Sequence, residues 1–79
     1  MLREMIKKNI SLKPSQVRDF VETASKCDFD VDIYYNRYVV DAKSILGVFG
    51  LDFNQPLTVQ FGKHNKEFEQ YLDTLAVAG

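Results

Sequence analysis

Apolar residues recur along the chain at two spacings, and each spacing predicts one kind of element. Positions i, i+3, i+4 and i+7 are apolar from Val17 to Ala24 and again from Phe68 to Leu75. Each of these segments therefore forms a helix with one apolar face. Pro14 fits the first turn of the first helix, where its missing N–H has no intrahelical partner. Segments that partly or fully alternate, or that return from a tight turn, predict strands at 2–8, 29–33, 38–40 and 57–61.

Polar residues separate these segments. Asn9 is read as the break that ends the first strand, and Asn36-Arg37 as a tight hairpin turn, since Asn tolerates a positive φ. Ser44 is a suitable N-cap for a brief helix over the apolar segment 45–49. Residues 52–56 read as a polar turn before the last strand.

The element order is strand, helix, strand, strand, short helix, strand, helix, or βαββαβα. Each strand has one apolar face and each long helix one apolar stripe. These features predict a single α+β domain over residues 1–79, with a four-stranded antiparallel sheet covered on one face by three helices. Ferredoxin-like folds share much of this order, so topology alone assigns no function.

Composition narrows the function classes. The 79 residues are 46% hydrophobic and 27% charged with a net charge of -1, which is typical of a soluble globular domain and gives no electrostatic support for nucleic-acid binding. No long apolar run or signal peptide is present, so we expect a cytoplasmic protein that does not engage a membrane. The lone Cys27 cannot form an internal disulfide, and it lies too far from the lone histidine to suggest a metal site. No cofactor is expected.

Two segments resemble the HPr family of the bacterial sugar phosphotransferase system. They are Phe20-Val21-Glu22-Thr23-Ala24-Ser25-Lys26 and Val40-Asp41-Ala42-Lys43-Ser44-Ile45-Leu46-Gly47-Val48. The resemblance implies that family's open-faced β-sandwich. It also implies that Ser44 occupies the regulatory serine position, which a dedicated kinase phosphorylates.

The family's phosphate-accepting motif is not matched. In the family, a histidine precedes the first helix and carries phosphate from enzyme I to sugar-specific components. Counting back from the first helix aligns Lys13 with this histidine, whereas matching the proline aligns Ser11 with it. Neither side chain is an imidazole, the nucleophile that this chemistry needs. The lone His64 falls between the last strand and the last helix, and we expect it to be an exposed loop residue at the opposite end of the domain.

Three apolar residues of the short helix are candidates for partner binding. Ile45, Leu46 and Phe49 cannot all point inward, and Val48 and Leu51 are better core positions; the alternative is that all five are buried. An exposed apolar patch is typical of a docking surface. By resemblance, its partners would be HPr kinase, the catabolite control repressor or enzyme I-like proteins.

We therefore expect a non-enzymatic regulatory or interaction protein of the catabolite-repression type. The alternatives are a phosphocarrier in phosphoenolpyruvate-dependent sugar transport that uses an unorthodox acceptor, and a diverged scaffold with an unrelated partner.

Overall fold

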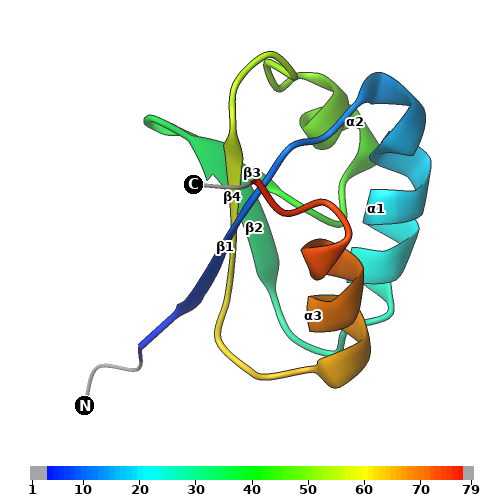
Figure 1. Cartoon of the computed structure of the whole chain (residues 1–79), viewed down its shortest axis with the longest axis vertical. Helices are drawn as coiled ribbons and strands as arrows, with labels where there is room; N and C mark the ends of the chain where they lie inside the picture. The colour runs from blue at the N-terminus through cyan, green and yellow to red at the C-terminus, as the bar shows by residue number, and fades with distance from the viewer. Residues whose placement is uncertain (1–3, 78–79) are drawn as a thin grey trace.

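The computed structural model describes residues 4–77 and contains two layers, a sheet and a set of helices that covers one of its faces (Figure 1). The strands lie in the order β1-β4-β2-β3 and all neighbours are antiparallel. The strands are β1 (Ile6–Ile10), β2 (Val31–Tyr35), β3 (Tyr38–Asp41) and β4 (Leu57–Phe61). The helices are the 3₁₀ turn η1 (Pro14–Gln16), α1 (Val17–Ser25), α2 (Ile45–Phe49) and α3 (Lys66–Asp73). The predicted α+β class, element order and antiparallel sheet are confirmed.

The first strand begins and ends later than the alternation predicted. Asn9 belongs to β1, where it pairs with Thr58, and its side-chain Oδ1 accepts a hydrogen bond from the Thr58 hydroxyl at 3.0 Å. A polar residue is tolerated there because alternate side chains of β1 point to the uncovered face of the sheet. Reading Asn9 as a break was therefore wrong. Of the predicted strand, Leu2 and Arg3 lie outside the described residues.

The second strand also begins later than expected. Phe29 precedes β2, and its ring stacks at 6.0 Å, centroid to centroid, on Phe61 of β4. Phe29 is therefore apolar because it packs on β4 from the connection between α1 and β2, and not because it alternates within a strand. The predicted hairpin turn is confirmed, because Asn36 has a φ of 53° between β2 and β3.

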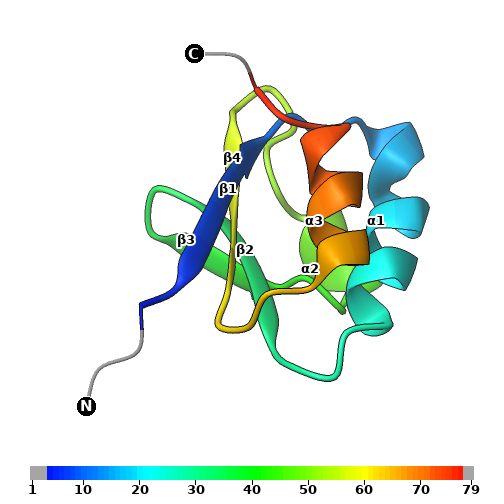
Figure 2. The same cartoon turned by 60° about the horizontal axis from the view of Figure 1, so that its bottom comes forward.

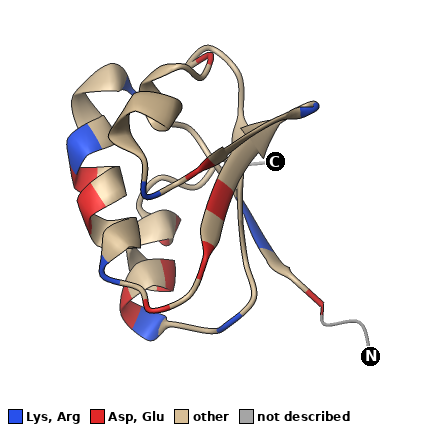
Figure 3. Ribbon diagram, turned by 180° about the vertical axis from the view of Figure 1, so that it is seen from behind, with Lys and Arg blue, Asp and Glu red and all other residues tan. Residues whose placement is uncertain are grey.

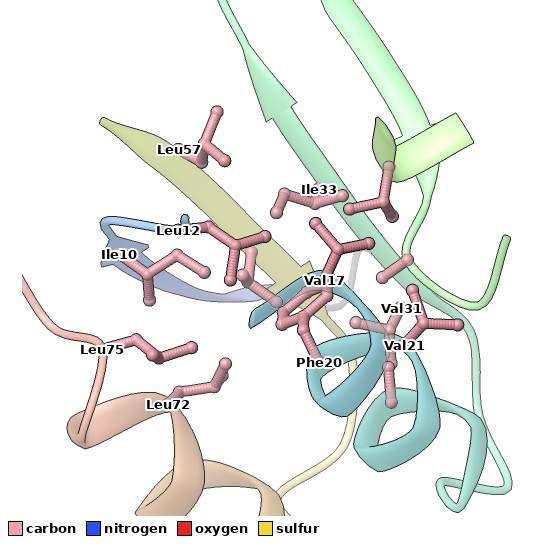
Figure 4. Packing of buried hydrophobic residues seen from close by; sticks show 14 of the residues in the cluster. Ile10, Leu12, Val17, Phe20, Val21, Val31, Ile33, Leu57, Leu72 and Leu75 are labelled. Atoms are coloured by element: carbon pink, nitrogen blue, oxygen red, sulfur yellow. The ribbon is translucent and has the colours of Figure 1, made fainter. Parts of the chain in front are cut away.

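The core lies between the sheet and the helices α1 and α3 (Figures 1, 2 and 4). In the close-up, Val17 of α1 lies beside Ile33 of β2, and Leu72 and Leu75 lie on the Ile10 side of the cluster. Phe61 and Phe68 join β4 to α3 through an edge-on ring contact with centroids 5.1 Å apart. No polar or charged residue among those described is buried, so this core is purely apolar.

The segment after α3 returns to β1. Ala76 forms an isolated antiparallel bridge with Ile10, and the Ser11 N–H donates to the Leu75 carbonyl at 2.9 Å. The Val77 N–H donates to the Asn9 carbonyl at 3.2 Å. These bonds fix the end of β1, and with it the loop that leads into α1.

No helix in the described part of the chain is long and apolar enough to cross a membrane.

Candidate functional site

Three hydrogen bonds that involve side chains help to hold the loop before α2. The Ser44 hydroxyl accepts from the Gly47 N–H at 3.2 Å, which confirms Ser44 as the N-cap of α2. One residue earlier, the Lys43 N–H donates to the Asp41 carboxylate at 2.8 Å. The Lys43 ammonium donates to the Cys27 carbonyl, also at 2.8 Å, just beyond the end of α1. Ser44 is therefore presented from a loop anchored both to its own helix and to α1.

The short helix after Ser44 exposes three apolar side chains. Ile45 is 40% exposed, Leu46 83% and Phe49 50%, whereas Val48 and Leu51 are buried. We call Ile45, Leu46 and Phe49 the α2 patch. The prediction that Val48 and Leu51 belong to the core and the other three do not is confirmed, so the all-core alternative is wrong. The docking role of the α2 patch stays a prediction.

A tyrosine of the edge strand lies beside the α2 patch. The Tyr38 hydroxyl is so close to Gly50 that a Cβ built on this glycine would lie 3.4 Å from it. Tyr38 is itself half-exposed. It therefore extends the apolar surface from α2 onto β3 and adds one polar group at its margin.

The loop before α1 has a different character. Its sequence is Ser11-Leu12-Lys13, in which Leu12 is buried and both neighbours are exposed. The Lys13 N–H donates to the Gln16 side chain at 2.9 Å, a contact local to the start of η1. Ser11 and Lys13 thus both lie where the resemblance placed the acceptor, and this loop contains no imidazole.

His64 lies at the other end of the sheet. Ile6 pairs with Phe61 and Ile10 with Leu57, so the chain that leaves β4 toward His64 lies far from the loop that leaves β1 toward α1. Figure 1 shows the β4–α3 connection at the bottom of the molecule and the β1–α1 connection at the top. The predicted position of His64 is confirmed, and so is its exposure, because 82% of its side chain is accessible.

The contact between His64 and Glu69 was not predicted. Its Nδ1 lies 3.3 Å and 3.2 Å from the two carboxylate oxygens of Glu69. Glu69 also accepts the Asn65 N–H at 2.9 Å, while the Asn65 side chain caps α3 by accepting the Phe68 N–H. Burial alone would raise the pKa of the Glu69 carboxyl, but the Asn65 N–H and the His64 ring outweigh it and hold this pKa below its ordinary value. The sequence signal that could have indicated this contact is an N-cap residue, Asn65, followed four positions later by an acid.

Cys27 faces a shallow cavity of about 210 Å³ between the end of α1 and the start of α3. The lining residues are Thr23, Lys26, Cys27, Asn65, Glu67 and Phe68. Burial raises the pKa of the Cys27 thiol; the nearby Lys43 opposes this shift and Asp28 adds to it. A thiol with a raised pKa is a poor nucleophile and metal ligand. The residues described contain no group of three or more side chains able to hold a metal ion.

Comparison with known proteins identifies the family. The family model described as "PTS HPr component phosphorylation site" matches residues 6–78. The chain belongs to the HPr family of the phosphotransferase system. No curated protein matches it.

Two solved HPr structures show the same fold. The phosphocarrier protein HPr from Bacillus anthracis str. Ames superposes with a TM-score of 0.73 at 21% identity, covering 95% of this chain and 100% of that one. HPr-C-His from Thermoanaerobacter tengcongensis gives a TM-score of 0.63 at 25% identity, covering 92% of this chain and 90% of the other. The open-faced sandwich implied by the resemblance is therefore confirmed.

Charged residues are not segregated by sign along the helices of this HPr domain. Figure 3 shows acidic and basic positions interspersed along the helices. The features that separate its surfaces are instead the apolar side chains of the α2 patch, the anchored Ser44 and the His64–Glu69 pair. Of the residues predicted as sites, the fold brings Ser44 together with the α2 patch and places Ser11 and Lys13 in a separate loop.

Proposed function

We propose that this HPr-family protein is a regulatory interaction module, which receives phosphate on Ser44 and does not relay phosphate from the loop before α1. The observation that carries the proposal is the contrast between these two loops. Ser44 directly precedes an exposed apolar surface, whereas the loop before α1 offers only Ser11 and Lys13.

Chemistry supports the negative half of the proposal. Rapid and reversible phosphoryl transfer needs a nucleophile that is neutral near pH 7, which an imidazole supplies. A lysine ammonium has no free electron pair, and a serine hydroxyl without an adjacent base is a weak nucleophile. Neither Ser11 nor Lys13 meets the requirement.

Charge supports the positive half. A phosphoserine brings nearly two negative charges and three strong acceptor oxygens. On Ser44 they would lie next to the α2 patch, of which Leu46 is 83% exposed. The combined surface suits a protein partner that presents an apolar pocket with basic residues at its rim. HPr kinase, the catabolite control repressor and enzyme I-like proteins are the partners we propose, in the cytoplasm.

Incubation with HPr kinase and ATP, followed by intact-mass measurement, tests the proposal. We expect one phosphate on the native chain and none on Ser44→Ala. Ser15→Ala is the matched control, because Ser15 is an exposed serine at the start of η1, and it should be phosphorylated like the native chain. An unmodified native chain, or a phosphate that persists in Ser44→Ala, would contradict the proposal.

A second candidate function is that of a phosphocarrier with an unorthodox acceptor. It is favoured by membership of a phosphocarrier family over nearly the whole chain. Labelling with phosphoenolpyruvate and enzyme I distinguishes the two candidates. Phosphate that enzyme I transfers equally to the native chain, to Ser44→Ala and to His64→Ala would establish a carrier acceptor distinct from both residues.

A further inference from the structure

The pair His64 and Glu69 has a feature that the proposed function does not use. Both carboxylate oxygens of Glu69 lie within 3.3 Å of Nδ1 of the imidazole. A carboxylate accepts hydrogen bonds but donates none when ionised, so Nδ1 carries the proton and Nε2 carries the free electron pair. The Glu69 contact therefore selects one tautomer of the ring.

The carboxylate itself is held in place. Glu69 accepts the Asn65 N–H at 2.9 Å, and only 20% of its side chain is exposed. His64 in contrast is 82% exposed. A half-buried acid that is held by a backbone N–H thus orients an exposed ring, and a similar arrangement is found where a histidine acts as a nucleophile or a base.

From this geometry we propose a second modification site, in which His64 accepts a phosphoryl group on Nε2 and Glu69 is the positioning residue. The donor class is a small high-energy phosphate, such as an acyl phosphate or a phosphoramidate. The inference goes beyond the proposed function and is independent of Ser44. It is also distinct from a relay at the loop before α1, because His64 lies at the opposite end of the sheet.

The step balances without a further reactant. The electron pair on Nε2 attacks phosphorus, the N–P bond forms, and the bond from phosphorus to the leaving group breaks with its electrons departing on that group. The proton on Nδ1 stays in the hydrogen bond to Glu69, whose negative charge offsets the positive charge that develops on the ring. Hydrolysis would return inorganic phosphate and the free imidazole.

Charges around the pair are mixed. Lys63 and Lys66 flank the pair in sequence, but the Lys63 Nζ lies 3.6 Å from an Asp28 carboxylate oxygen. The positive charge of Lys8 on β1 is one of the causes that hold the pKa of the Glu69 carboxyl low. Glu67, the remaining acid at the start of α3, lines the cavity near Cys27. The lysines favour approach of an anionic donor, and Glu67 opposes it.

The experiment treats the native chain with acetyl phosphate and follows acid-labile phosphate by intact mass and by ³¹P NMR. His64 is the chain's one histidine, so His64→Ala should abolish the label. Glu69→Gln keeps an oxygen for the Asn65 N–H but loses the charge, and should slow labelling about tenfold. Glu67→Gln is the matched control, because Glu67 lies two positions before Glu69 and makes no hydrogen bond to the ring. It removes a charge that opposes the donor, so this variant should label no more slowly than the native chain.

An ordinary exposed histidine also reacts slowly with such donors, so N-acetylhistidine amide provides the reference rate. Labelling no faster than this reference, a native rate in Glu69→Gln, or a label that survives in His64→Ala would each overturn the proposal. ¹⁵N NMR of the ring gives an independent readout: we expect the Nδ1–H tautomer in the native chain and a tautomer mixture in Glu69→Gln. Because phosphoserine is stable to acid, failure here and failure of the Ser44 proposal are distinguishable.

Discussion

The loops that lead into α1 and into α2 perform the same structural task in different ways. The loop before α1 contributes the buried Leu12 to the core, and its hydrogen bonds use only its backbone: the Ser11 N–H donates to the Leu75 carbonyl and the Lys13 N–H to the Gln16 side chain. The loop before α2 buries no large side chain, and instead bonds to α2 through Ser44 and to the end of α1 through Lys43.

The proposed function rests on this difference between the two loops. In the loop before α1, the exposed side chains of Ser11 and Lys13 make no hydrogen bond within the described residues, so their replacement should cost little stability. A loop fixed by polar side chains depends on their identity. The same residues that hold α2 also present Ser44 and the α2 patch, so structure and surface are coupled there.

The largest expected effect comes from removing the apolar anchor. Leu12 is 1% exposed and packs among Ile10, Val17 and Leu57 on the sheet side of α1 (Figure 4). Leu12→Ala should lower the free energy of unfolding by about 3 kcal/mol, through lost burial and the cavity that it leaves. Urea denaturation followed by circular dichroism measures this. If the free energy of unfolding fell by less than about 1 kcal/mol, Leu12 would not be the anchor of the loop before α1.

The next effect tests the polar anchor of the second loop. Lys43→Met removes the hydrogen bond from the ammonium to the Cys27 carbonyl and retains most of the aliphatic volume. Because the donor is charged but only half-buried, we expect a loss of about 1.5 kcal/mol. Hydrogen exchange should also increase at the end of α1.

Lys13→Met is the matched control for this change. Within the described part of the chain, the Lys13 side chain makes no hydrogen bond or ion pair, so the free energy of unfolding should stay within about 0.5 kcal/mol of the native value. Equal losses in the two variants would remove the distinction between the loops.

Ser44→Ala should have a smaller effect on stability than on modification. It removes the N-cap contact to the Gly47 N–H, which costs about 1 kcal/mol. Ser15→Ala removes a hydroxyl that makes no side-chain hydrogen bond within residues 4–77, and should be nearly neutral. Thermal unfolding of the two variants side by side measures the cap. If Ser15→Ala were the more damaging, the cap assignment would be wrong.

Periodicity of apolar residues was sufficient to predict the fold, because α1, β2 and β4 bury the residues that their spacing indicates. The spacing was only partly right for the last helix, since Tyr71 is half-buried and α3 ends at Asp73, before Leu75. Periodicity also did not indicate that β3 has no buried residue. It failed at β1, where Asn9 lies on the uncovered face and a polar side chain does not interrupt pairing. It also gave no sign of the bridge between Ile10 and Ala76, which pairs residues far apart in the chain.

The candidate sites were predictable where they depend on local chemistry. Ser44 as an N-cap and the exposure of Leu46 follow from short-range spacing. The bond from Lys43 to Cys27 spans 16 positions, and the His64–Glu69 pair depends on how the chain turns between β4 and α3. Contacts of this kind require the folded backbone.

The stability of the hairpin formed by β2 and β3, which precedes Ser44, should depend on pH. Burial raises the pKa of the Asp32 carboxyl on β2, and Asp41 of β3, its cross-strand partner, and then Asp30 raise it further. The folded state therefore binds a proton more readily than the unfolded state, so this contribution to stability is present at acid pH and is lost as pH rises through the folded-state pKa.

Asp32→Asn should remove this dependence. We expect the variant to be more stable than the native chain at neutral pH and the difference to shrink on acidification, as measured by urea denaturation across pH. An Asp73→Asn control changes an exposed acid at the end of α3 and should leave the pH dependence from Asp32 in place. A native-like pH profile in Asp32→Asn would show that the Asp32–Asp41 pairing does not strain the hairpin.

The smallest effect on folding is expected at the most exposed residue of the α2 patch. Leu46→Ala makes the same change in side chain as Leu12→Ala, but Leu46 lies in α2 and is 83% exposed. Leucine and alanine also both favour helices. The free energy of unfolding should change by less than about 0.5 kcal/mol.

Binding should nevertheless weaken about tenfold, equivalent to about 1.4 kcal/mol, if the Leu46 side chain inserts into a partner. The Michaelis constant of HPr kinase for this chain, compared between the native protein and Leu46→Ala, measures that loss. An unchanged constant would separate Ser44 from the α2 patch and limit the function of α2 to presenting the serine. If Leu46 is dispensable for folding but required for recognition, the exposed side chains of the α2 patch serve partner binding and not the stability of the core.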